Sequence, residues 1–206
     1  FFFLIALSTF MQCAPKEENS LKIFKYNQAS GITSLDPAFA KNQANIWAVS
    51  QLFNGLVQLD SSMNVAPAIA KSWEFSNESK TITFILRTDV KFHQKGVFEQ
   101  ATRFVTAADF VYSFNRIIDP KVASPGAWIF NGKIDTIKPF VALNDTTFQL
   151  NLQQAFGPML GILCMPYCFV VPHEAVALYG KDFRAHPLGT GPFVFKVWEE
   201  GTALVG

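Results

Sequence analysis

The sequence predicts an α/β fold built from short helices and strands. Residues 105–120 repeat their apolar side chains at helical spacing, whereas residues 70–93 form two alternating runs around a polar turn. Further short runs of both kinds follow one another along the 206 residues, without an internal repeat or a low-complexity tract. Helices and strands that intermix in this way are typical of the α/β class.

The composition bounds the class of protein. Half of the residues (50%) are hydrophobic and 22 are phenylalanine, which is enough for one large or two small cores and argues against disorder. The 17 basic and 16 acidic side chains leave a net charge of +1, and no basic run exists. We therefore expect no nucleic-acid partner, because such binding depends on neutralising phosphates.

The N-terminus carries the signature of export. Residues 1–12 are an almost wholly apolar run, shorter than the roughly 20 residues that span a bilayer as a helix. They fit the core of a signal peptide, and we expect it to be partial because neither a Met nor a basic region precedes it. The predicted location is therefore the cell envelope, on the periplasmic side.

Cys13 directly follows this run and indicates a lipoprotein, lipidated on its sulfur and anchored to a membrane. Residues 13–20 then form a polar tether that cannot fold alone. Gln12 stands where bacterial lipoproteins usually carry a small residue, so an ordinary signal peptide with an incidental cysteine is the alternative.

The first elements of the folded part are short. Residues 21–28 alternate as a strand. A loop follows, because Gly31 and the Asp36-Pro37 pair break any regular element. Residues 45–56 predict a helix with Asn45 as its N-cap and Gly55 near its end. Its apolar face consists of Ile46, Val49, Phe53 and Leu56. Residues 57–60 follow as a strand.

The next segment predicts a hairpin. Residues 65–73 allow a single helical turn that begins at Pro67. In the hairpin, Trp73 and Phe75 share one face of the first strand, and residues 76–80 form the turn. The second strand buries Ile82, Phe84 and Leu86, and residues 90–93 continue the meander.

Residues 105–120 predict the strongest helix of the chain. Thr106 and Asp109 form a pair like a capping box, although glutamate or glutamine is commoner at the second position. The apolar face consists of Phe110, Phe114, Ile117 and Ile118. Asp119-Pro120 ends the helix, because proline disfavours helical geometry in the residue before it.

The last third mixes strands, a buried stretch and a helix. Two strands flank a turn at Asn144-Asp145. The uncharged stretch 158–171 must be buried and is broken by Pro158 and Pro166, and residues 172–180 form a short helix. A last strand is predicted at 192–197. We expect the strands at 21–28, 56–59 and 192–197 to share one sheet, because none has an obvious local partner.

Cys164 and Cys168 lie four residues apart across a proline. Three interpretations stay open: two buried thiols, a disulfide in an oxidising compartment, or a metal pair. No second pair of cysteines or histidines stands at zinc-site spacing.

No catalytic pattern is present. There is no Gly-x-Ser-x-Gly motif and no His-Glu-x-x-His motif, and His93, His173 and His186 are scattered. Residues 189–193 have two glycines but no lysine, so we interpret them as a turn that needs unusual φ angles. We expect no catalytic residue, no metal and no cofactor.

Tryptophan is the one residue type that suggests a ligand contact. Trp47, Trp73 and Trp198 are expected in the core, as large aromatic side chains usually are. Trp128 differs because it lies in a loop rich in Gly and Pro. It is therefore a candidate for stacking against a ligand.

Several segments resemble one family. The stretches "LDPAFA", "QLFNGLV", "VAPAIAKSWEFSNESKTITFILRTDVKFH", "VTAADFVYSFNRIIDP", "VVPHEAV" and "GTGPFVFKVW" occur in the order and spacing typical of family 5 extracytoplasmic solute-binding proteins. These are the relatives of dipeptide- and oligopeptide-binding proteins. The resemblance covers about residues 21–206, and its most specific parts are the hairpin and the helix after it.

The resemblance implies a two-lobed, type II periplasmic-binding-protein fold. Lobe I would comprise residues 21–60 and 166–206, with residues 61–165 as an inserted subdomain. Relatives are more than twice as long, so we expect a truncated chain whose second lobe is missing. Residues 93–109 are longer than the corresponding link in relatives and should form a surface loop.

The resemblance also implies the function. Such proteins bind a solute between two lobes, close over it and deliver it to an ABC permease in the inner membrane. We expect a monomer that binds peptides. Peptide-binding relatives place the stretch after the Leu-Asp-Pro turn along the ligand, where backbone groups would pair with it like an edge strand. The matching candidates here, with those of the later cleft loop, are Lys41, Asn42, Gln43, Ala44, Gly126 and Trp128.

Alternatives to a peptide importer stay open. The same scaffold could bind a nickel chelate, haem or an oligosaccharide. From other classes, a structural surface lipoprotein or an exported hydrolase would also carry an export signal. A hydrolase would need a nucleophile beside a base.

Overall fold

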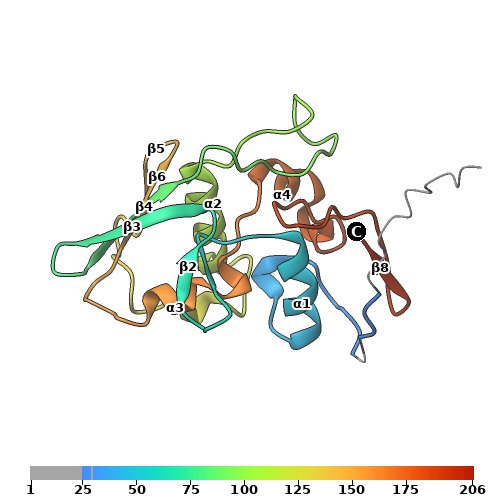
Figure 1. The fold of residues 1–206 in the computed structure, drawn as a ribbon, viewed down its shortest axis with the longest axis horizontal. Coiled ribbons are helices and arrows are strands. Elements are labelled where there is room, and N and C mark those ends of the chain that lie inside the picture. The colour runs from blue at the N-terminus through green and yellow to red at the C-terminus, as the bar shows by residue number, and fades with distance from the viewer. Residues whose placement is uncertain (1–24, 29) are drawn as a thin grey trace, which may run out of the picture.

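The computed structural model describes residues 25–28 and 30–206. The predicted signal peptide, the tether and Cys13 lie outside the described residues. A four-stranded sheet occupies one end of the molecule (Figure 1). At the other end lie helices α1 (Gln43–Leu52) and α4 (His173–Tyr179) and a small hairpin of β7 (Val197–Glu199) and β8 (Ala203–Val205). Among the described helices, none has the length and apolar character needed to cross a membrane.

The sheet contains the predicted hairpin. Its order is β3-β4-β6-β5, and every neighbouring pair is antiparallel. Its strands are β3 (Ala70–Ser76), β4 (Thr81–Leu86), β5 (Phe140–Asn144) and β6 (Thr147–Asn151). The predicted strands around Asn144-Asp145 are thereby confirmed. The expected continuation at 90–93 is wrong, because β6 takes the third place and only Lys91 forms a bridge, with Phe104.

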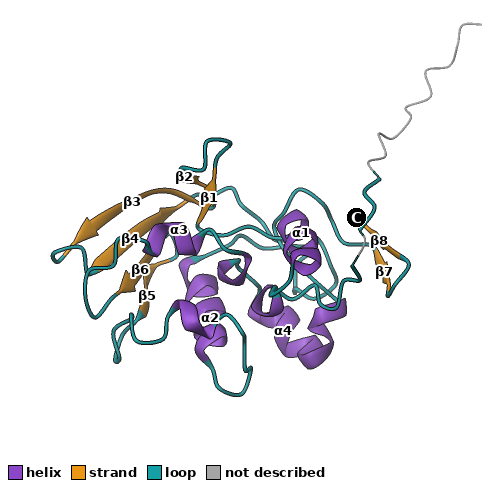
Figure 2. Ribbon diagram, turned by 90° about the horizontal axis from the view of Figure 1, so that it is seen from below, coloured by secondary structure: helices purple, strands orange, loops and turns teal. Residues whose placement is uncertain are grey.

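The two strands of the hairpin are buried to different degrees. The β4 residues Ile82, Phe84 and Leu86 are fully buried. On β3, Trp73 is partly buried and Phe75 is 50% exposed. The difference arises because β3 is the edge strand farthest from α2 (Ala107–Ile118). This helix packs against β5 and β6, at the other edge of the sheet (Figure 2).

Helix α2 confirms the predicted capping box and apolar face. The Thr106 backbone N–H donates to Asp109 Oδ2 over 2.8 Å, and the Thr106 hydroxyl is part of the same cap. Phe110, Phe114 and Ile117 are buried against the sheet. The Phe114 ring is central, because it packs against the rings of Phe130, Phe140 and Phe148 with centroids 5.1, 5.4 and 5.4 Å away.

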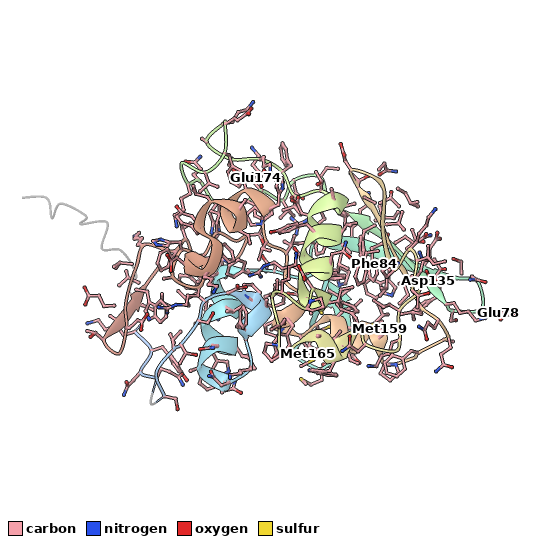
Figure 3. The ribbon with its side chains drawn as sticks, turned by 180° about the vertical axis from the view of Figure 1, so that it is seen from behind. Glu78, Phe84, Asp135, Met159, Met165 and Glu174 are labelled. Atoms are coloured by element: carbon pink, nitrogen blue, oxygen red, sulfur yellow. The ribbon has the colours of Figure 1, made fainter. Side chains whose placement is uncertain are left out.

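The buried apolar residues form two clusters. The sheet cluster comprises buried residues between Leu56 and Val170, including Phe84 and Met159, which Figure 3 labels. The helix cluster comprises buried residues at 35–53 and 171–188. The chain therefore passes from one cluster to the other near residue 54 and returns near residue 170.

The N-cap of helix α1 (Gln43–Leu52) lies three residues before the predicted one. This N-cap is Asn42, whose Oδ1 accepts the Asn45 backbone N–H at 2.9 Å, and not Asn45 as expected. The Asn45 side chain is buried and instead accepts the Thr33 backbone N–H. Both asparagines are good caps, so the contact with Thr33, twelve residues away, selects between them.

The predicted sheet of three distant strands is wrong. Strand β1 (Val57–Leu59) pairs with β2 (Val65–Pro67), where a helical turn was expected. Strand β7 (Val197–Glu199) pairs with β8 (Ala203–Val205), and residues 25–28 form no strand. Strand β1 pairs with its neighbour β2 because Asp60 closes a tight turn between them, where its Oδ1 accepts the N–H groups of Ser62 and Asn64.

The uncharged stretch 158–171 is broken as predicted, but it is only partly buried: Met159, Leu163 and residues 167–168 and 170–171 are buried, whereas Pro158 and Gly161 are exposed. It forms α3 (Met159–Leu163) and the short 3-10 helix η3 (Pro166–Cys168), and α4 (His173–Tyr179) follows. Cys164 and Cys168 are free thiols, and complete burial raises the pKa of the Cys168 thiol. The remaining 3-10 helices are η1 (Pro37–Phe39), η2 (Ala127–Ile129) and η4 (Gly180–Ala185).

The segment expected to be a surface loop, residues 93–109, is only partly one. Its tip is exposed at Gly96 and Glu99, but Val97 packs against the helix cluster and Phe98 packs against both clusters. The Lys95 ammonium lies 5.4 and 5.2 Å from the ring centroids of Tyr179 and Phe195. The insertion is therefore docked onto the rest of the molecule.

Candidate functional site

The stretch predicted to face a ligand lies at the start of α1. Lys41, Asn42 and Gln43 are exposed, whereas Ala44 is buried. Gln43 and Ala44 already belong to the first turn of the helix, so an extended strand edge does not form there. A ligand would instead meet exposed side chains and the N–H groups of the first helical turn, which lack partners within the helix.

A buried ion pair anchors residues 36–44, which we call the 36–44 turn, to helix α2. Arg116, in the last turn of α2, donates from both terminal nitrogens to both carboxylate oxygens of Asp36, over 2.8 and 2.5 Å. The two side chains are only 10% and 4% exposed. Burial opposes the charge on Arg116, but its hydrogen bonds to Asp36 and the negative charge of that carboxylate together raise the pKa of Arg116.

A second tie brings the two predicted ligand-facing stretches together. The buried Ser124 hydroxyl donates to the Ala38 carbonyl over 2.6 Å and accepts the Gly126 N–H at 3.0 Å. The 36–44 turn and the loop that leads to Trp128 are therefore anchored to one another. η1 also lies against η3, which completes this part of the surface.

Gly126 and Trp128 have different environments. Gly126 is buried, and a Cβ atom there would lie 2.6 Å from the Tyr167 ring, so this position offers a ligand only backbone atoms. Trp128 lies in η2 and is 48% exposed. The Lys133 ammonium donates to the Trp128 carbonyl over 2.8 Å and lies 5.9 Å from the indole centroid.

Trp47 is a residue that the sequence argument missed. It was expected in the core, but it is 45% exposed, and its ring meets Tyr26 edge to face with centroids 5.3 Å apart. Gln43 and Trp47 are four residues apart on α1 and so share one helix face. Correct placement of the start of α1 would have put Trp47 on this exposed face.

The glycine loop at 189–191 closes the other end of α1. The N–H of Gly191 donates to the Leu52 carbonyl over 2.9 Å, and the N–H of Phe193 donates to the Gln51 carbonyl. A Cβ atom on Gly189 would lie 2.0 Å from Leu52 O. Neither glycine of this loop has a positive φ, so the expected reason for glycine is wrong: close backbone contact requires it.

The same loop receives His93. Its backbone N–H donates to the Gly189 carbonyl over 2.9 Å, and its Nε2 lies 2.8 Å from the Gly191 carbonyl oxygen. Thr190 in turn donates its hydroxyl proton to Asn54 Oδ1 over 3.0 Å. His93 therefore fastens the segment after β4 to the end of α1.

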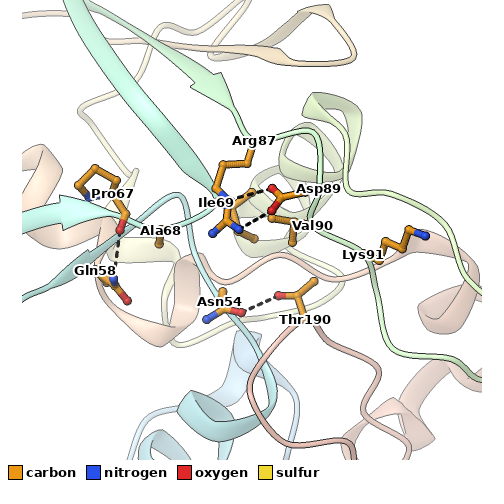
Figure 4. A pocket seen from close by; sticks show the side chains of 10 residues that line it. All are labelled: Asn54, Gln58, Pro67, Ala68, Ile69, Arg87, Asp89, Val90, Lys91 and Thr190. Atoms are coloured by element: carbon orange, nitrogen blue, oxygen red, sulfur yellow. Dashed lines mark hydrogen bonds and ion pairs between the residues drawn. The ribbon is translucent and has the colours of Figure 1, made fainter.

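A pocket of about 370 Å³ lies beside this junction, and none of its lining residues belongs to the 36–44 turn (Figure 4). Its walls include Asn54 and Thr190 on one side and Arg87 and Asp89 on the other. Arg87 and Asp89 form a bidentate pair over 3.0 and 2.7 Å, so their charges largely satisfy each other. Only Lys91 adds a further charge to the lining.

The three histidines stand in separate environments. His93 binds the glycine loop, the exposed His173 lies 3.3 Å from Glu174, and His186 stacks on the Tyr179 ring at 4.5 Å. Within residues 25–28 and 30–206, no three His, Cys, Asp or Glu side chains gather as a group that could hold a metal ion.

The sequence of this chain matches a known protein family over most of its length. Residues 64–205 match the middle region of the bacterial extracellular solute-binding proteins, family 5. The probable deoxycholate-binding periplasmic protein YgiS of Escherichia coli K12 is 31% identical, across 86% of this chain and 35% of its own. The glutathione-binding protein GsiB of Escherichia coli is 28% identical, across 83% of this chain and 31% of its own.

A solved structure gives the same result for the fold. The periplasmic binding protein DppA of Helicobacter pylori, in complex with the peptide STSA, superimposes with a TM-score of 0.73 at 28% identity. The match covers 84% of this chain and 36% of DppA. The chain thus has the mixed α/β fold of periplasmic binding proteins and spans about a third of the length of the relatives it matches.

Proposed function

Because this chain belongs to the bacterial extracellular solute-binding proteins, family 5, we propose that it forms part of the peptide-binding subunit of an ABC importer. The family consists of binding proteins and not of enzymes. Binding a solute and delivering it to a permease requires a shaped, closing surface and no reactive group. The proposed function therefore needs no nucleophile or metal from this chain.

A peptide is the ligand class that the observations favour. The main support is the likeness of this chain, over 84% of its length, to a protein solved in complex with a peptide. Glutathione, named for a second relative, is itself a small peptide. Deoxycholate, named for the first relative, makes an amphipathic non-peptide ligand the second candidate.

We propose that the ligand contacts the 36–44 turn and Trp128. Lys41, Asn42 and Gln43 present polar side chains beside the N-terminus of α1, which suits carbonyl and carboxylate groups of a peptide. Trp128 presents a half-exposed indole, on which an apolar side chain or a peptide plane can lie. Ala44 and Gly126 would contribute only backbone and shape.

The domain assignment remains a proposal that fits the two clusters. Residues 21–60 and 166–206 would form lobe I, and residues 61–165 the inserted subdomain. The crossings of the chain near residues 54 and 170 support this division. Periplasmic location, the anchor at Cys13, the monomeric state and delivery to an inner-membrane permease are likewise proposals.

Ligand-induced stabilisation tests the proposed function. The complete gene product containing this chain, prepared without residues 1–12 and refolded to remove bound ligand, is mixed with pools of di- to hexapeptides. A peptide at a hundredfold excess over its dissociation constant should stabilise the protein by about 2.7 kcal/mol, visible as a raised melting temperature. Free amino acids at the same concentration serve as the control.

Two other results of this measurement would change the conclusion. Stabilisation by deoxycholate, a nickel chelate, haem or an oligosaccharide, with none by peptides, would keep the family and refute the peptide ligand. Stabilisation by none of these would refute the importer and favour a structural lipoprotein.

Trp128→Ala is expected to weaken binding of the selected peptide about tenfold, as loss of an aromatic contact worth roughly 1 kcal/mol or slightly more would do. Calorimetric titration measures the change. Phe75→Ala is the matched control, because Phe75 is 50% exposed but lies on the edge strand of the sheet. Equal dissociation constants for both variants and the unchanged protein would remove Trp128 from the site.

A further inference from the structure

We propose that Arg116 is a positioning residue, which sets the 36–44 turn in the conformation that meets the ligand; this inference rests on the function proposed above. Arg116 lies on α2, whose apolar side is buried in the sheet cluster. Its partner Asp36 precedes η1 and is 80 residues away in the chain. The ion pair therefore fastens the turn to an element of the other cluster.

The geometry of the pair favours orientation over net stability. A guanidinium that donates to both oxygens of a carboxylate has one coplanar arrangement, so it defines direction as well as distance. Burying two charges costs desolvation energy that their attraction roughly offsets. An apolar pair of similar size would stabilise the fold equally well, but it would leave the direction of the turn less defined.

Hydrogen bonds link Arg116, through Asp36, to the rest of the 36–44 turn. Asp36 Oδ1, one of the oxygens that Arg116 binds, also accepts the N–H of Ala38 at 3.0 Å and so caps η1. The Ala38 carbonyl then accepts the Ser124 hydroxyl, which leads towards Trp128. Both proposed ligand-contacting stretches therefore depend on the position of one carboxylate.

Arg103 provides a matched comparison within the same protein. It donates to both oxygens of Asp109 over 2.8 and 2.7 Å and to both oxygens of Glu174 over 2.6 and 2.7 Å. It also packs over the Phe92 ring, much as Arg116 packs over Phe183. Arg103 ties the start of α2 to α4, and none of its hydrogen bonds reaches the 36–44 turn.

The test compares Arg116→Met with Arg103→Met in the complete gene product, under conditions in which both are folded. Amide hydrogen exchange is measured at Ala38 and Ala40, and binding is measured with the same peptide pools. In Arg116→Met we expect exchange at these amides to rise at least tenfold and peptide affinity to fall about tenfold, as loss of a charged hydrogen bond would cause. In Arg103→Met both quantities should stay within about twofold, whatever the melting temperature does.

The outcomes separate this inference from the proposed function. If the protein without substitutions binds no peptide, the proposed function is refuted. If amide hydrogen exchange at Ala38 is equal in the two variants, the positioning role is refuted. Faster exchange with unchanged peptide affinity also refutes it, because the turn would then not be a ligand contact. If Arg116→Met does not fold, two other variants are held to the same expectations: Asp36→Asn, which keeps the shape of the Asp36 side chain, and Arg116→Lys, which keeps the charge but removes the planar fork.

Discussion

Phe114→Ala is expected to lower the free energy of unfolding by about 4 kcal/mol, within the range for deleting a fully buried aromatic ring. The Phe114 side chain is completely buried, and four other rings surround it. Alanine would leave a cavity between α2 and the sheet, and the rings of Phe130, Phe140 and Phe148 would each lose a partner. Urea unfolding of the complete gene product, followed by circular dichroism, measures the loss.

Phe75→Ala is the control for this prediction. Phe75 belongs to the same sheet but is half exposed on its edge strand, so its removal should change the free energy of unfolding by only about 0.5 kcal/mol. A loss below 1 kcal/mol for Phe114→Ala, no larger than that for Phe75→Ala, would contradict the packing of α2 on the sheet.

Gly189→Ala is expected to destabilise the protein by about 3 kcal/mol or more, because the new methyl group would collide with backbone. The Cβ atom would lie 2.0 Å from Leu52 O and 2.9 Å from Leu52 C, and neither atom can rotate away. Relief would require the loop to move from the end of α1, with loss of the hydrogen bonds from Gly191 to Leu52 and from His93 to Gly189. The midpoint of urea unfolding reports the effect.

Gly161→Ala makes the comparison specific. Gly161 lies exposed in α3, and a Cβ atom there would meet nothing within 4 Å. Alanine should stabilise this helix by roughly 0.5–1 kcal/mol, since glycine loses more backbone entropy on folding. Opposite signs for the two substitutions are the expected result, and stabilisation by both would disprove the close approach at residue 189.

The elements that could be predicted from sequence have short-range causes. Thr106 of the capping box and Pro120, which stops the helix, flank the helix that they bound, and the hairpin turn at 77–80 joins strands that are neighbours in the chain. The pairing of the hairpin strand β4 with β6 could not be predicted, because the paired residues are 60 or more positions apart in the chain. The predicted start of α1 was wrong for the same reason, since the Asn45 side chain accepts the Thr33 backbone N–H and does not cap the helix.

The candidate site divides in the same way. The resemblance indicated Lys41 to Gln43 and Trp128, and their exposure agrees with a surface role without testing it. The sequence places Asp36 in a loop and in the Leu-Asp-Pro turn, and Arg116 in the predicted helix 105–120, but it gives no sign that the two side chains meet. Their significance requires the two side chains to be seen together, 80 residues apart in the chain and buried.

By itself, the sequence determined the class of protein, because its motifs stand in a typical order along the chain. It also determined the helix predicted at 105–120 and the first hairpin, because each depends on the spacing of residues that are close neighbours in the chain. Only the tertiary structure decided why Gly189 must be glycine, where α1 begins and what holds the 36–44 turn. Those features are contacts between elements distant in sequence, whose loop-closure entropy is offset only when the whole core forms.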